Sequence, residues 1–246
     1  MATQTQVLID RAQARRTERL FFIGMSIAFA GTVFAGFART YFLRAHFDPT
    51  PLIPLLRLHG FVFTSWLVLF LVQTTLVATK RINTHRRLGI AGAIIASLMV
   101  IIGTTTAIIR AKIIQVPPGS PSPLVFLTIP LGDMLVFAVL VISGFYFRRK
   151  PDTHKRVMLL ATIGILPAAV ARLPLAFMQQ GGPFVFFGVT DLFIIPCLVY
   201  DIVTRGRPHR ATLLAGAFIV LSQPLRLIIG GTSAWLAFAT WITQWS

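Results

Sequence analysis

Four charged residues interrupt long apolar stretches of this sequence, and they repeat in the order acid, then base. Asp133 is followed by Arg172, and Asp191 is followed by Arg226. A charge exposed to lipid costs at least about 2.5 kcal/mol on insertion scales, so the four side chains should point into the protein. We therefore predict that they face one another as two Asp–Arg contacts in the outer half of a membrane.

Two interpretations of these charges are open. Buried ion pairs can hold helices in register without binding a ligand. Alternatively, the charges line an outward-opening cavity that binds an anionic or polar headgroup or conducts protons, a use typical of intramembrane ionisable residues. Pro174 and Pro224 lie beside the two arginines, as in the broken helices of transporter binding sites. The predicted ligand-binding residues are Asp133, Asp191, Arg172, Arg226, His59 and Gln223.

Three histidines, His85, His154 and His209, each follow a short run of Lys and Arg. Neighbouring cations oppose protonation of an imidazole, and a neutral imidazole can ligate a metal. His85 and His154 belong to different predicted helices at one depth, as the axial ligands of haem b require. The alternative is that all three are polar cap residues at the interface. No nucleophile elbow or glycine-rich phosphate loop is present, which favours a non-enzymatic protein.

The elements that must position these residues are membrane helices. Of the 246 residues, 55% are hydrophobic and 12% are charged, whereas soluble domains are about a quarter charged. A helix of about 20 apolar residues crosses the hydrocarbon core. We predict an all-α, seven-helix transmembrane domain over 20–246, preceded by a basic cytoplasmic tail at 1–19. The predicted spans are 20–38, 59–79, 88–109, 124–147, 157–178, 184–200 and 212–230.

After the first helix, the other six spans form three hairpins that run in the same direction. Of the 23 Lys and Arg residues, 16 lie in the tail and in the three basic hinges inside the hairpins, and five lie on the other side. This bias predicts that the N-terminus is cytoplasmic and the C-terminus is external. The net charge of +16 therefore indicates contact with anionic lipid headgroups rather than with nucleic acid.

Several short motifs carry a resemblance to known proteins. They are Leu58-His59-Gly60, Leu71-Val72-Gln73, His85-Arg86-Arg87-Leu88-Gly89, Leu131-Gly132-Asp133, His154-Lys155-Arg156-Val157-Met158-Leu159-Leu160-Ala161-Thr162 and Tyr200-Asp201. Together they resemble a widespread group of uncharacterised bacterial multi-pass inner-membrane proteins, which implies the same localisation here. The chain is also similar, less closely, to b-type cytochromes of the cytochrome b561 sort, which implies haem b. It departs from those cytochromes because it lacks two transmembrane His pairs.

The predicted function is accordingly that of a non-enzymatic ligand-binding, transport or accessory subunit that uses the outer charged cluster. The alternative is a haem b-binding electron-transfer protein that uses His85 and His154. The expected partners are the lipid bilayer and, in an accessory role, other membrane subunits or further copies of the chain.

Overall fold

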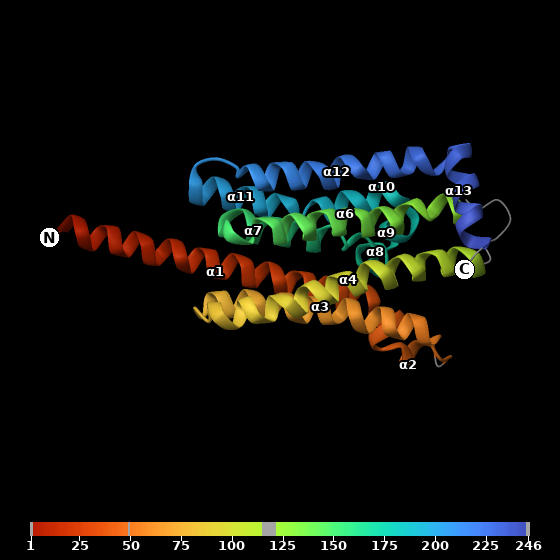
Figure 1. The fold of residues 1–246 in the computed structure, drawn as a ribbon, viewed down its shortest axis with the longest axis horizontal. Helices are drawn as coiled ribbons and strands as arrows, with labels where there is room; N and C mark the ends of the chain where they lie inside the picture. Colours follow the sequence, from red (N-terminus) through yellow and green to blue (C-terminus); the bar gives the residue numbers. More distant parts are fainter. Residues whose placement is uncertain (1, 49, 115–121, 245–246) are drawn as a thin grey trace.

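The computed structural model describes residues 2–48, 50–114 and 122–244, and these residues form helices and no strands. The helices pack side by side as a bundle (Figure 1). In chain order they are α1 (Ala2–Phe37), η1 (Ala38–Phe42), α2 (Arg44–Phe47), α3 (Pro54–Ala78), α4 (Ile82–Ile113), α5 (Pro123–Phe126), α6 (Thr128–Tyr146), η2 (Phe147–Arg149), α7 (Pro151–Ile163), α8 (Pro167–Val170), α9 (Ala176–Gln180), α10 (Gly182–Asp191), α11 (Ile194–Arg205), α12 (Arg210–Gly230) and α13 (Ser233–Gln244).

Six helical stretches of the described residues are long and apolar enough to cross a membrane. Large apolar side chains such as Ile90 and Leu214 lie exposed on the outer faces of these helices, where contact with lipid is more favourable for them than contact with water. The protein is therefore an all-helical protein with the character of a multi-pass membrane protein. The six stretches are Gln13–Phe42, Pro54–Ala78, Ile82–Ile113, Pro123–Arg149, Gly182–Arg205 and Arg210–Gly230.

The region 157–178, expected to be one continuous span, is divided among α7, α8 and α9. Pro167 lacks a backbone N–H and its ring clashes with the carbonyl four residues earlier, so α7 ends at Ile163. A weaker turn continues across the break, where the Leu166 N–H donates to the Ile163 carbonyl at 3.0 Å. This interrupted helix nevertheless lies in the core. Its fully buried side chains are Leu160, Ala161, Thr162, Ile163, Leu166, Ala169 and Val170.

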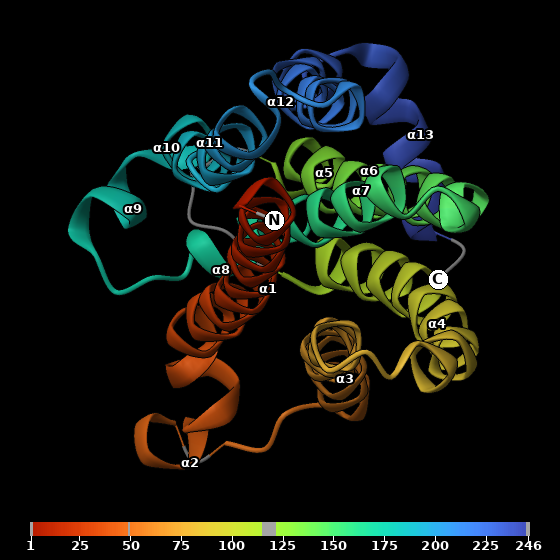
Figure 2. The same ribbon diagram turned by 90° about the vertical axis from the view of Figure 1, so that its left-hand side faces the viewer.

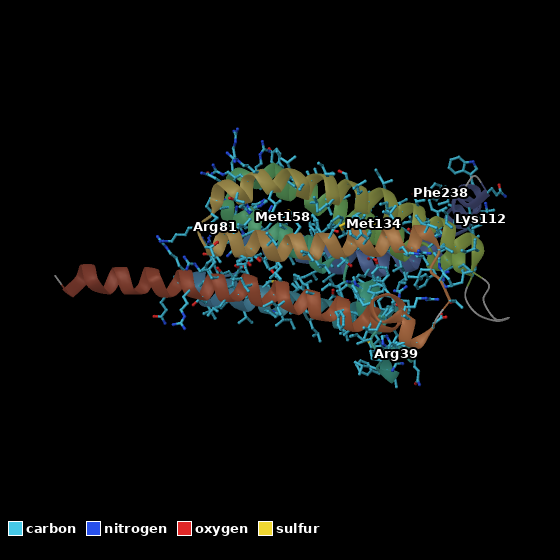
Figure 3. The ribbon with its side chains drawn as sticks, turned by 90° about the horizontal axis from the view of Figure 1, so that it is seen from below. Arg39, Arg81, Lys112, Met134, Met158 and Phe238 are labelled. Carbon is cyan, nitrogen blue, oxygen red and sulfur yellow. The ribbon has the colours of Figure 1, made fainter. Side chains whose placement is uncertain are left out.

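The three basic hinges lie together at one end of the bundle, which we call the basic end (Figure 1). They are the turns 79–81, 147–150 and 206–209. The first part of α1 extends beyond the bundle at this end, and Figure 2 views the helices from there. Arg81 marks the basic end, whereas Arg39 and Lys112 lie at the opposite, far end (Figure 3). The turns that lead into α4, α7 and α12 thus lie at the same end of the bundle.

Candidate functional site

One of the two predicted Asp–Arg contacts is present, and it joins the second hairpin to the third. Nη1 of Arg226 on α12 lies 2.5 Å from Oδ1 of Asp133 on α6, and both side chains are only 8% exposed. The guanidinium also donates from Nη2 to Ser222 Oγ at 2.7 Å, and it lies over the ring of Phe187. Both charges are therefore compensated inside the bundle.

A glycine beside the acid makes room for this pair. A Cβ at Gly132 would collide with the Arg226 side chain, so only glycine lets the guanidinium pass to Asp133. Further along the same interface, a Cβ at Gly230 would come within 3.0 Å of Thr128 Oγ1 and the Val125 carbonyl oxygen. The close approach of α12 to α6 thus depends on small residues, as is usual where membrane helices pack.

The prediction of two Asp–Arg contacts did not assign their partners, and among the described residues neither Asp191 nor Arg172 forms such a contact. Asp191 instead accepts a hydrogen bond from Gln223 Nε2 at 2.7 Å. Arg172 donates to the Ala168 carbonyl at 2.6 Å and lies 4.9 Å over the ring of Phe37 on α1. The cause is the break at Pro167, because Arg172 follows the short α8 rather than continuing the register of α7.

His59 lies near Arg172 and apart from the Asp133–Arg226 pair. Its ring stacks on Phe63 at 4.1 Å between centroids, and the positive charge of Arg172 acts on it. Its Nδ1 atom is buried and has no hydrogen-bond partner. The six predicted ligand-binding residues therefore fall into two groups: Asp133, Arg226, Asp191 and Gln223 are satisfied by protein contacts, whereas His59 and Arg172 have no acidic partner.

At the basic end, the structure brings His85 and His154 together. Their ring centroids are 6.4 Å apart, and the ring planes are inclined by 77°. Nδ1 of His154 lies 2.7 Å from the Gly144 carbonyl oxygen, which fixes that ring. Nδ1 of His85 is buried without a hydrogen-bond partner, and so is Oε1 of Gln73 on the adjacent α3. Such orphaned polar atoms are rare in folded proteins.

His209 takes no part in this pair and is a helix cap. Its Nδ1 accepts a hydrogen bond from the Ala211 N–H at 3.0 Å, at the first turn of α12. Burial lowers the pKa of His209, and the nearby charges of Arg156 and Arg205 lower it further. A neutral imidazole is the form that can accept this bond. The cap interpretation of the hinge histidines is therefore confirmed for His209.

Sequence reasoning missed the most completely buried ion pair of the described residues, which also lies at the basic end. Asp201 on α11 has no exposed surface, and its Oδ1 receives Arg156 Nη2 at 2.5 Å. Its Oδ2 accepts from Thr212 Oγ1 at 2.5 Å and from the His209 N–H at 3.0 Å. The signal was an acid at the end of an apolar run, but Arg156 looked like one more hinge cation.

A more exposed ion-pair network surrounds this pair. Lys155 Nζ lies 2.6 Å from Glu18 on α1 and 2.8 Å from Asp152 in its own helix. The hydrogen bond from Lys155 lowers the pKa of Asp152, although partial burial opposes the shift. The Lys155–Glu18 contact therefore ties the extension of α1 to the start of α7.

Comparisons with known proteins returned no relative: no family model, no curated protein and no solved structure matches this chain. Within the described residues, no group of three or more His, Cys, Asp and Glu side chains could hold a metal ion. A bare metal ion usually takes at least three protein ligands. Two facing imidazoles are instead the number of protein ligands that a six-coordinate haem needs, because the macrocycle supplies the other four donors.

Proposed function

We propose that the chain is an integral protein of a bacterial inner membrane that binds haem b between His85 and His154 and transfers electrons. The observation that carries this proposal is the 6.4 Å spacing of the two imidazole rings, which come from different helices. His85 and His154 would hold the haem iron, with one ring nitrogen from each.

The surroundings of the two rings suit this role. The Gly144 carbonyl accepts from Nδ1–H of His154 in the tautomer that leaves Nε2 free to ligate. Arg86 follows His85 directly and Arg81 precedes it by four residues, so cations are at hand for carboxylates such as propionates. Bound haem would supply reversible one-electron chemistry, while the protein residues fix the ligand geometry and the local charge.

The absorption spectrum of the full chain tests this proposal. Protein purified from cells supplied with haem should show a Soret band, and dithionite should shift it. His85→Ala and His154→Ala should each abolish at least about nine-tenths of the band, because a single axial ligand holds haem weakly. His209→Ala is the matched control at the same end of the bundle, and it should keep the band. A haem-replete wild-type protein without a Soret band would overturn the proposal.

We further propose seven membrane crossings, with the N-terminus in the cytoplasm and the C-terminus outside. The seventh crossing is the interrupted helix formed by α7 and α8 (Pro151–Val170). Its buried position among the other spans supports this count. Reporters fused after Arg87, Arg156 or Arg210 should read cytoplasmic, and a reporter fused at Ser246 should read external. A cytoplasmic C-terminus would contradict the count.

A second candidate function uses the outer residues that lack an acidic partner. Arg172 and His59 interact electrostatically, and Arg110 adds a second positive charge close to Arg172. The buried, unpartnered Nδ1 of His59 favours a ligand with a polar group there. In this role the protein is a non-enzymatic binding, transport or accessory subunit for an anion. The spectroscopic experiment bears on both functions, because haem-free protein would remove the electron-transfer role and leave the binding role of the outer residues.

A further inference from the structure

A shallow, half-open cavity of about 250 Å³ lies at the basic end, between the extension of α1 and the hinge 79–81, and its lining side chains are exposed. Its lining side chains are all cations: Arg15, Arg16, Arg19 and Lys80. Neither the haem proposal nor the outer cluster uses these four residues. The cavity is therefore a separate feature, and its lining defines what it can hold.

The spacing on α1 places the three arginines around one side of the helix. Arg15 and Arg19 are four residues apart and thus lie above one another, with Arg16 beside them. The rotation of α1 is fixed by its neighbour Glu18, whose carboxylate lies 2.6 Å from Lys155 Nζ on α7. Because this ion pair turns Glu18 toward α7, the acid is used there and does not neutralise the arginines.

Lys80 reaches the cavity from an unusual backbone conformation. Its φ is +62°, and it is the only residue other than glycine with a positive φ in the described part of the chain. This conformation ends α3: the Lys80 N–H donates to the Val77 carbonyl at 3.1 Å and the Arg81 N–H to the Leu76 carbonyl at 2.8 Å, a common helix C-cap. The cap holds Lys80 at the start of the hinge, beside the arginines of α1.

No acid of the described residues forms an ion pair with these four cations. Four like charges around one cavity repel one another, and a bound anion would remove that repulsion. Guanidinium groups bind phosphate with paired, charge-assisted hydrogen bonds, and lysine adds a point charge. We propose that this cavity binds a phosphate group, carried either by an anionic lipid headgroup or by free phosphate.

The test uses the full chain in nanodiscs and the probes phosphatidylglycerol and inorganic phosphate. Native mass spectrometry measures how much phosphatidylglycerol stays on the protein in otherwise zwitterionic discs. Arg19→Gln/Lys80→Gln should weaken retention by about fivefold for each cation removed. Arg149→Gln/Arg207→Gln is the matched control, with the same charge lost from the other two hinges, and its retention should change by less than about twofold.

Competition separates the two sources of phosphate. If millimolar inorganic phosphate displaces the lipid from wild-type protein, or binds in discs without anionic lipid, the ligand is free phosphate. If it does neither, the ligand is the headgroup. Equal losses in both double variants would mean that surface charge alone retains the lipid, and would overturn the site. Failure of wild-type protein to retain either probe would also overturn it. The Soret band is independent of all these outcomes.

Discussion

Arg226→Leu is expected to lower the free energy of unfolding in detergent by about 3–5 kcal/mol, because it leaves Asp133 buried and unpaired. The carboxylate is 8% exposed and has no other charged partner, since its Oδ1 meets only Arg226. Removing both partners should be far milder than removing one, because no uncompensated charge is left. Arg226→Leu/Asp133→Leu should therefore recover most of the lost stability, as measured by thermal or denaturant unfolding.

Two controls make this result specific to the pair. Arg226→Leu/Asp191→Leu should not recover stability, because Asp191 binds Gln223 and not the guanidinium. Arg172→Leu should be tolerated better than Arg226→Leu, because Arg172 is exposed and has no acidic partner. An Arg226→Leu protein as stable as the wild type would mean that the arginine reaches the interface instead of Asp133.

Asp201→Leu, at the basic end of the bundle, is also expected to lower the free energy of unfolding by about 3–5 kcal/mol. This change would strip Arg156, which is 4% exposed, of its only fully buried charge partner. It would also leave the Thr212 hydroxyl and the His209 N–H without an acceptor at the start of α12. Buried donors without acceptors add their own desolvation cost. Hydrogen exchange of the α11–α12 turn should rise along with the loss of global stability.

The neighbouring acid provides the matched control. The Asp152 side chain is 56% exposed, so Asp152→Leu should cost less than about 1 kcal/mol, as exposed ion pairs do. Arg156→Met/Asp201→Leu should be milder than Asp201→Leu alone, by the argument used for the other pair. Equal effects of the Asp152 and Asp201 changes would contradict the assignment of Asp201 as the buried anchor.

The positions of the apolar spans could be predicted because hydrocarbon thickness and backbone hydrogen bonding leave little choice in a membrane. The free energy needed to expose a charge to lipid correctly predicted that Asp133 and Arg226 lie inside the bundle. It could not choose the partner, since depth along a helix says nothing about the direction in which a side chain points. Asp191 and Arg172 accordingly take other partners, and Pro167 changes the register before Arg172.

The Asp201–Arg156 pair was missed for a different reason. Both residues stand at the ends of apolar runs, where sequence alone cannot distinguish a solvated charge from a buried one. Their burial arises from three elements that meet in space: α7, α11 and α12. The pairing of His85 with His154 was accessible to sequence reasoning, because both follow hinges at a common depth. The distance between the two rings, on which the proposed function rests, could not be predicted from the sequence.

The Asp133–Arg226 pair also constrains how the chain is made. The two residues are 93 positions apart, so α6 enters the bilayer before its partner has been synthesised. At about 5–20 residues per second, the carboxylate waits roughly 5–20 seconds for its arginine. During that time the span that contains α6 carries an unpaired acid, which raises the free energy of inserting it into the membrane. This span is the most apolar of the six, so its other residues can offset that free energy. The arrival of α12 therefore completes the ion pair and fixes α6 in the bundle.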